Sequence, residues 1–302
     1  MPKHRLSAVA LLVIALTTGG RAEAGSAGKP IWFYRVESAA GQATFFYPSF
    51  HLRDSRVPRP PITMLDSVGR LVLEADILEA KTHRETLMPY LLGPEPRDLA
   101  TLFTATEVAR IRARAACNGL DGAVERLRLS FIATIVALPC PRAGAGGDAG
   151  GSYEEGLELA AQRRGLKITG LETAEEEFAA LAALPDRLFI GEIKELAAHP
   201  DRADKTLDRM IALYNDGDFD GLYDLMLSTA PKNAADRKLF MQKVLLDRNH
   251  NMVERLADVL AEGNALVVVG ALHFPGEGGI VDLLKQQGFR ITMVDGGDGA
   301  LR

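Results

Sequence analysis

This sequence has few cysteines and few aromatic residues, and its basic residues do not outnumber its acidic ones. Its 302 residues include two cysteines, one tryptophan and 6% aromatic residues, and 35 basic residues stand against 40 acidic ones. Neither Cys117 nor Cys140 has a second Cys or His at zinc-ligand spacing, which argues against a zinc site built on them. A net charge of −5 gives no reason to expect nucleic acid or an anionic membrane as a partner.

Long apolar runs are also missing after residue 16, so no transmembrane span is predicted in the mature chain. The N-terminus has a basic segment at 3–5, an apolar run at 6–16 and the small-residue triplet Ala22-Glu23-Ala24. This layout predicts a cleaved secretory signal over residues 1–24, because about 20 apolar residues are needed to span a bilayer. An uncleaved anchor is the alternative. We expect the mature chain to be periplasmic or secreted.

Short runs of aromatic and β-branched residues predict the strands of a sheet. Segments 31–36 and 43–47 flank a small, polar turn and predict an N-terminal β-hairpin. Later apolar runs show little alternation, which is typical of strands buried on both faces of a parallel sheet. These runs occupy 71–73, 167–171 and 265–269, and a further candidate strand occupies 290–294.

Most of the remaining chain has helical periodicity. Helices are expected at 152–164 and 173–184, and several more between 186 and 262. Thr173, with Glu176 three residues later, predicts a capping box. Residues 265–294 are predicted to form one strand–helix–strand unit. The fold class is therefore α/β: a central, mostly parallel or mixed sheet covered by helices, with large helical insertions and an N-terminal β-hairpin.

Two features bear on how the mature chain is held together. A Gly- and Ala-rich stretch at 143–151 predicts a flexible linker within one domain of residues 25–302. Its halves are about 25–142 and 152–302. In an oxidising compartment we expect Cys117 and Cys140 to form a disulfide; two buried free thiols are the alternative.

Polar side chains follow several of the predicted strands at the point where each strand ends. Glu74 follows the run at 71–73, Glu172 follows 167–171, and His273 comes shortly after Gly270 at the end of 265–269. His51 follows the second strand of the hairpin in a comparable way. Ligand sites of parallel sheets lie at the carboxyl ends of the strands. Imidazoles and carboxylates gathered there can bind a divalent metal or act as an acid–base set. The alternative is that each is a satisfied polar group at a strand end.

The segment after His273 supports a site. Glycines at 276, 278 and 279 allow the backbone to approach a bound group closely, and a helix beginning near Ile280 favours negative charge at its N-terminus. Glu277 is a secondary candidate, with complementing the helix dipole as its alternative role.

Four segments resemble the motifs of the TraB/GumN family. They are Leu73-Glu74-Ala75-Asp76, Gly170-Leu171-Glu172-Thr173, Asp247-Arg248-Asn249 and Val268–Gly279. These elements follow the family order, and the resemblance extends from about residue 31 to 295. The family resembles the Tiki proteins, which are metal-dependent, membrane-associated proteases, and more distantly the erythromycin esterases and haem-binding lipoproteins of the ChaN type.

The resemblance implies roles for individual residues. His51, Glu74 and His273 would hold a divalent metal such as Mn, Co or Zn. Glu74, Arg248 and Asn249 would be catalytic, with Arg248 stabilising oxyanion charge. Glu172, Gly270 and Glu277 are secondary candidates.

One departure from the family pattern leaves two functions open. The first family motif has glycine where this chain has Pro48, three residues before His51, and proline fixes φ and lacks an N–H. The first hypothesis is an exported, metal-dependent, peptidase-like hydrolase acting on a peptide or small-molecule substrate. The second is a non-catalytic protein that binds or sequesters a peptide or haem on the same fold.

Overall fold

The computed structural model describes residues 29–51, 54–120, 122, 124–140 and 152–296. The predicted signal segment at 1–24 and the predicted flexible linker at 143–151 lie outside these residues. In the part that is described, no helix is both long and apolar enough to cross a membrane.

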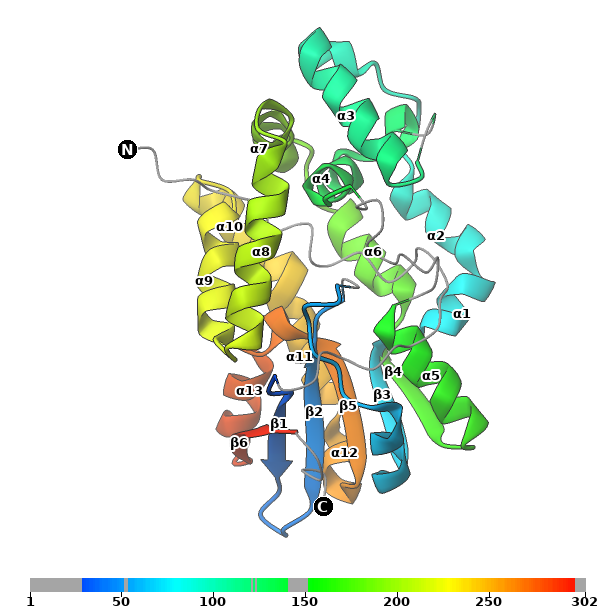
Figure 1. Ribbon diagram of the computed structural model, residues 1–302, viewed down its shortest axis with the longest axis vertical. Helices are drawn as coiled ribbons and strands as arrows, with labels where there is room; N and C mark the ends of the chain where they lie inside the picture. Colours follow the sequence, from blue (N-terminus) through cyan, green and yellow to red (C-terminus); the bar gives the residue numbers. More distant parts are fainter. Residues whose placement is uncertain (1–28, 52–53, 121, 123, 141–151, 297–302) are drawn as a thin grey trace.

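Six strands form one mixed sheet in the order β4-β3-β5-β2-β1-β6 (Figure 1). β3, β4, β5 and β2 run parallel to one another, and β1 is antiparallel to both of its neighbours, β2 and β6. The strands are β1 (Trp32–Glu37), β2 (Ala43–Ser49), β3 (Arg70–Ala75), β4 (Lys167–Glu172), β5 (Ala265–Gly270) and β6 (Arg290–Asp295). The predicted α/β class, the hairpin and all the predicted strands are confirmed.

β5 shows why the unalternating apolar runs form the centre of the sheet. All six of its residues, Ala265–Gly270, are buried, because β3 and β2 flank its edges and helices cover both of its faces. The predicted strand–helix–strand unit exists, but its two strands do not pair. β6 lies at the sheet edge beside β1, with β2 and β1 between it and β5.

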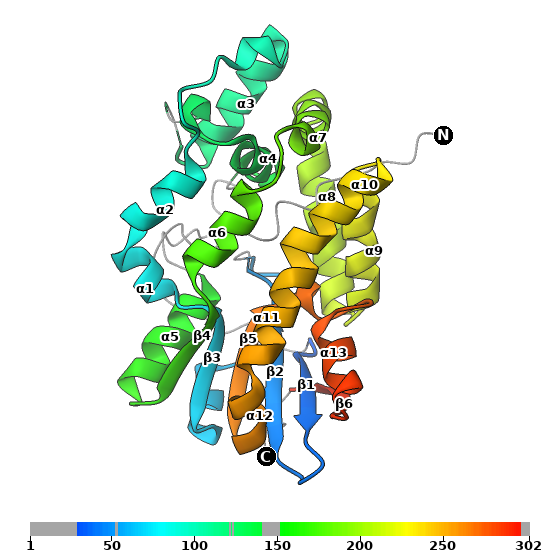
Figure 2. The ribbon, with the colours of Figure 1, turned by 180° about the vertical axis from the view of Figure 1, so that it is seen from behind.

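Thirteen α-helices occur in the described residues (Figures 1 and 2). They are α1 (Ile77–Thr82), α2 (Arg84–Leu91), α3 (Ala105–Cys117), α4 (Leu129–Ala137), α5 (Tyr153–Arg163), α6 (Ala174–Ala182), α7 (Arg187–Ala198), α8 (Asp201–Asn215), α9 (Phe219–Thr229), α10 (Ala234–Met241), α11 (Asp247–Arg255), α12 (Ala257–Glu262) and α13 (Ile280–Gln286). The predicted capping box of Thr173 and Glu176 starts α6.

Alternate side chains of the strands enter two separate cores. On one face, Leu71, Leu73 and Val268 pack with Leu157 and Ala161 of α5. On the other face, the intervening strand residues, among them Val72, Val267 and Val269, pack against α11, α12 and α13. These helices contribute Met252, Leu260 and Leu284, respectively. Figure 2 shows α11 and α12 crossing this second face.

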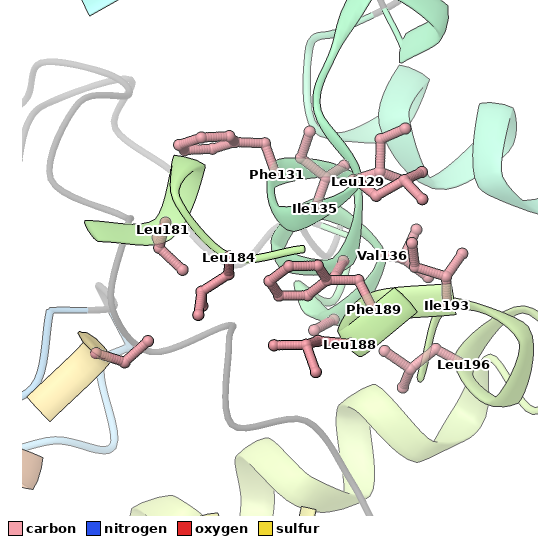
Figure 3. Close-up of a cluster of buried hydrophobic side chains, with 14 of the residues drawn as sticks. Leu129, Phe131, Ile135, Val136, Leu181, Leu184, Leu188, Phe189, Ile193 and Leu196 are labelled. Carbon is pink, nitrogen blue, oxygen red and sulfur yellow. The ribbon is translucent and has the colours of Figure 1, made fainter. Parts of the chain in front are cut away.

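The other helices form a layer beyond the carboxyl ends of the parallel strands (Figures 1 and 2). Its core joins α4, α6 and α7 through large apolar side chains (Figure 3). Phe131 of α4 is stacked on Phe178 of α6, and Phe189 of α7 belongs to the same core. Cys117 at the end of α3 and Cys140 beyond α4 form the predicted disulfide. This helical layer faces the sheet edge at which the candidate residues gather.

Candidate functional site

The structure brings the polar residues at the strand ends into one buried cluster. Glu74 is the penultimate residue of β3, and Glu172 is the last residue of β4. His51 follows β2, and His273 lies in a short 3-10 helix, Ala271–His273, directly after β5. Glu74, Glu172 and His273 are buried, and the His51 side chain is 16% exposed. The carboxyl ends of four adjacent parallel strands thus supply the cluster.

Glu74 is at the centre of this cluster. Its Oε2 accepts a hydrogen bond from the Gly270 amide at 2.7 Å and lies 3.6 Å from His51 Nε2. Its Oε1 accepts from Arg248 Nη2 at 2.6 Å and lies 3.5 Å from His273 Nε2. Burial alone raises the pKa of Glu74, but the histidines and Arg248 outweigh it and hold the pKa well below its ordinary value. The carboxylate is therefore ionised.

Arg248 joins the two carboxylates. Its guanidinium donates from Nε to both oxygens of Glu172, at 3.1 and 3.0 Å, and from Nη2 to Glu172 and Glu74. Nη1 donates to the Val244 carbonyl at 3.4 Å. The side chain is 4% exposed. All three guanidinium nitrogens are committed to protein acceptors, so this arginine fixes the position of Glu74.

Asn249 orients the ring of His273. Its Nδ2 donates to the Gly278 carbonyl at 2.9 Å, which leaves Oδ1 facing His273 Nδ1 at 2.5 Å. Because an amide oxygen only accepts, His273 carries its hydrogen on Nδ1. His273 Nε2 is buried, points toward Glu74 and has no hydrogen-bond partner among the described residues.

Glu154 orients the ring of His51, as Asn249 orients that of His273. The sequence alone did not single out Glu154 as a candidate. This buried residue in the first turn of α5 accepts at Oε1 from Ser49 Oγ and lies 3.1 Å from His51 Nδ1. Burial raises the pKa of Glu154, but His51 and Ser49 outweigh it and bring the pKa to about 2. An ionised carboxylate only accepts, so His51 also carries a hydrogen on Nδ1. Burial lowers the pKa of His51, yet its hydrogen bond to Glu154 and the nearby carboxylate of Glu74 hold it well above the ordinary value.

The two rings are therefore oriented in the same way and need the same electrostatic surroundings. Each holds a hydrogen on Nδ1 and turns Nε2 toward one oxygen of Glu74. A neutral Nε2 is an acceptor, and an acceptor facing a carboxylate repels it. Positive charge between the rings and Glu74 removes this repulsion, supplied either by protons on Nε2 or by a bound cation.

Gly270 has no side chain and so leaves room for His51 Nε2 beside Glu74 Oε2. A Cβ at this position would lie 2.6 Å from His51 Nε2 and 3.2 Å from Glu74 Oε2. Beside it is a cavity of about 20 Å³, enough for one water or one ion. Its lining is Ser49, Phe50, His51, Leu222, Gly270, Ala271, Leu272 and His273. Among the described residues, no group of three or more His, Cys, Asp or Glu side chains is spaced as a metal-binding set.

A π-helical segment, Gln242–Leu246, joins α10 to α11 directly before Arg248 and Asn249. Such segments occur mostly as single turns inside α-helices and are frequent at functional sites. Both residues are buried although adjacent, whereas His250 beside them is exposed. The helix thus points two neighbouring side chains into the cluster.

Two further acidic residues, Glu277 and Glu177, differ in burial. Glu277, a secondary candidate, is exposed and lies in the loop beyond His273. Glu177 of α6 was not singled out, yet it is buried. Burial raises its pKa to about 8, with Arg248 opposing the shift and Glu74 and Glu172 adding to it. Its carboxyl is therefore mainly protonated at neutral pH.

Pro48 fits into β2 without turning His51 away from the site. The register between β1 and β2 ends at Tyr34 and Phe46, so no β1 residue needs an N–H from Pro48. On the other side Pro48 stays in register with Val269 of β5. Its carbonyl accepts a hydrogen bond from Tyr214 at 2.7 Å.

These features define an α/β protein with a buried His–Glu–Arg cluster at the carboxyl edge of a mixed sheet. Residues 32–293 match the TraB/PrgY/gumN family. Because this match covers nearly the whole chain, the chain belongs to that family. No curated protein and no solved structure matches it.

Proposed function

We propose that this protein is an exported, metal-dependent hydrolase with a peptidase-like reaction, centred on His51, Glu74 and His273. One observation carries the proposal: two imidazole rings, each held at Nδ1 by an acceptor, direct Nε2 at the opposite oxygens of one buried carboxylate. Metal-binding histidines commonly have their other ring nitrogen held in this way.

Although no three of the described side chains are already spaced as a ligand set, two imidazoles and a carboxylate have the donor chemistry of a site for Mn, Co or Zn. Two ligands that each lie about 2.0–2.1 Å from a tetrahedral ion are roughly 3.4 Å apart. The observed distances from Glu74 to the two Nε2 atoms, 3.6 and 3.5 Å, are close to that spacing. His273 Nε2 is a buried atom with no hydrogen-bond partner among the described residues, and the cavity beside Gly270 has room for one ion. These observations support a metal-binding role for the set.

Charge balance supports the same proposal. Glu74 and Glu154 are carboxylates of the cluster, and Arg248 is the fixed cation that binds Glu74. Burial raises the pKa of Glu172 above its ordinary value, although Arg248 opposes this shift through direct hydrogen bonds from Nε. The remaining negative charge attracts either protons or a divalent cation to the two Nε2 atoms.

A bound divalent metal would polarise a substrate carbonyl and lower the pKa of a bound water. His51 and His273 would hold the ion through Nε2, and Glu74 would hold it or accept a proton from the attacking water. Arg248 keeps Glu74 ionised and oriented. We assign it this positioning role in place of the oxyanion-stabilising role suggested by family resemblance, because its nitrogens already bind protein acceptors. Phe50, Leu222 and Leu272 make part of the cavity lining apolar.

The second hypothesis, a non-catalytic binding protein, started from Pro48. That residue leaves β2 intact and His51 facing Glu74, so it no longer favours the second hypothesis over the first. Export is proposed on the N-terminal pattern alone, with the mature chain starting at Gly25. Intact-mass measurement of the protein recovered from the exported fraction tests it, and a chain that keeps residues 1–24 there would refute cleavage.

The decisive experiment combines metal binding with activity. Metal-stripped protein is titrated with Mn, Co and Zn, and each form is then offered a panel of peptides and esters. We expect one ion per chain and metal-dependent hydrolysis, both lost in His273→Gln. His250→Gln is the matched control, since His250 is exposed on the helix that carries Asn249. Hydrolysis that survives metal removal, or a His273→Gln variant as active as the control, would refute the proposal.

A further inference from the structure

The two histidines of the cluster are held by chemically different acceptors. Asn249 holds His273 through a neutral amide oxygen at 2.5 Å, whereas Glu154 holds His51 through a carboxylate oxygen at 3.1 Å. The two contacts come from opposite directions: α11 supplies Asn249 from one face of the sheet, and α5 supplies Glu154 from the other. The ring of His51 therefore depends on a helix that supplies no metal ligand or other member of the proposed catalytic set.

Glu154 differs from the other acidic residues of α5 in what its carboxyl contacts. Glu155 binds Lys81 at 2.6 Å, and Glu158 accepts from the amides of Ile77 and Leu78 at 3.1 and 3.2 Å, where α1 begins. Those two carboxyls connect α5 to α1. Glu154 instead binds Ser49 and His51 through one oxygen; its Oε2, like Oε2 of Glu155, has no partner among the described residues.

The partners of the two carboxyls differ: Glu155 is paired with a lysine and its side chain is 13% exposed, whereas the Glu154 side chain is 6% exposed and no lysine or arginine is among its hydrogen-bond partners. A buried carboxylate with one oxygen left unpaired keeps part of its desolvation penalty. The fold does not need that charge, because the apolar residues Tyr153, Leu157 and Ala160 already pack α5 onto the sheet. The interaction that the carboxylate does provide is a fixed acceptor beside His51 Nδ1.

We propose that Glu154 is the positioning residue of His51: it holds the ring hydrogen on Nδ1 and thereby presents Nε2 to Glu74 and to the cation of the proposed site. The part of this inference that concerns the cation rests on the proposed function. The part that concerns the ring does not, because the contacts among Glu154, His51 and Glu74 exist in the chain itself. Acceptors of this kind fix which nitrogen of a histidine carries the hydrogen.

The first test reads the ring directly. In protein labelled with ¹⁵N-histidine, the two ring nitrogens of His51 are observed at a pH where the imidazole is neutral, with His51→Gln identifying the signals. We expect the hydrogen on Nδ1 in the wild type and in Glu154→Gln, whose amide oxygen also accepts. In Glu154→Ala we expect a mixture of both tautomers. An unchanged Nδ1–H tautomer in Glu154→Ala would overturn the inference.

The second test measures zinc affinity by calorimetry on the same proteins. We expect Glu154→Ala to bind zinc about 10–100-fold more weakly than the wild type, and Glu154→Gln to lose less. Glu155→Ala is the matched control, since it removes the neighbouring carboxylate, which binds Lys81. Equal losses in Glu155→Ala and Glu154→Ala would overturn the specific role of Glu154. If Glu154→Ala does not fold, Glu154→Leu against Glu155→Leu decides the affinity test.

The two tests separate failure of the inference from failure of the proposed function. A wild-type protein that binds no zinc, manganese or cobalt would refute the metal site. The tautomer of His51 in Glu154→Ala would still decide whether Glu154 positions the ring.

Discussion

The backbone amide of Gly270, at the end of β5, donates to Oε2 of Glu74 on the neighbouring strand β3 at 2.7 Å. The register between these strands runs from Arg70 and Ala265 to Leu73 and Val268, so Glu74 lies one position and Gly270 two positions beyond the last paired residues. It ties the central carboxylate of the cluster to the backbone that leads into His273. The family motif thus places a glycine where a side chain would enter the site.

Gly270→Ala should therefore impair the site more than the fold. Its Cβ would lie 2.6 Å from His51 Nε2, closer than real Cβ contacts, and the His51 ring would have to move. We expect at least a tenfold loss of metal affinity, as for other disruptions of ligand orientation, measured by calorimetry. Gly191→Ala is the control, because nothing lies within 4 Å of its added Cβ and it is helical. Equal metal affinity in the two variants would contradict the role assigned to Gly270.

Removing the charge of Arg248 should destabilise the whole protein. Arg248→Met leaves Glu74 and Glu172 buried without their shared cation, and breaking a buried ion pair in this way costs about 3–5 kcal/mol. Urea unfolding at neutral pH measures the free energy of unfolding.

The matched control for that change is Lys205→Met. Lys205 pairs with Asp201 on α8, and both side chains are more than half exposed, at 74% and 62%. An exposed pair contributes about 0–1 kcal/mol. A loss in Arg248→Met no larger than in this control would show that the two carboxylates do not depend on the arginine.

The strands were predictable because their residues leave few alternatives. Val267, Val268 and Val269 form part of a run that must be buried on both faces, so β5 could be located without the structure. The order of the strands was not predictable to the same extent. β6 follows β5 through α13, yet it pairs with β1, because partner choice depends on packing between distant segments.

The candidate site shows a similar division. The rule that ligands gather at carboxyl ends of parallel strands placed Glu74, Glu172 and His273 together from local pattern alone. Arg248 and Asn249 came from family resemblance, since the preceding π-helical segment has no sequence signature that would reveal it. Glu154 was missed because acidic residues are common in the first turn of a helix, where they favour the helix dipole. Its neighbour Glu155 made that ordinary explanation sufficient.

The disulfide should stabilise the helical layer. Cys117 and Cys140 are separated by 23 positions and connect the end of α3 to the chain beyond α4. In the chain-entropy account, a cross-link over such a loop contributes roughly 3 kcal/mol to the free energy of unfolding. We expect the double variant Cys117→Ala, Cys140→Ala to lose about that much in urea unfolding. A double variant as stable as the oxidised wild type would contradict this, and reduced wild type serves as the second comparison.

The last prediction concerns Glu192 of α7, in the helical layer beyond the sheet. Its Oε1 is buried without a hydrogen-bond partner among the described residues, and burial raises the pKa of the carboxyl from 4.5 to about 8. The folded protein therefore holds this proton more tightly than the unfolded chain does. The free energy of unfolding should fall as pH rises from about 4.5 to about 8, by at most about 1.4 kcal/mol per pH unit from this group. Above that window the loss from this group is complete.

Glu192→Gln should remove this part of the pH dependence, because the amide does not ionise. Urea unfolding at the two ends of the window, for wild type and variant, gives the difference. Glu158 and Glu177, whose pKa values are also raised to about 8, keep a slope in both proteins. The variant should therefore be less steep, and its advantage over the wild type should grow with pH. Gly191→Ala, next to it on α7, introduces no titrating group and should shift stability equally at both ends. A constant difference between Glu192→Gln and wild type across the window would show that Glu192 ionises at the same pH in the folded and unfolded states.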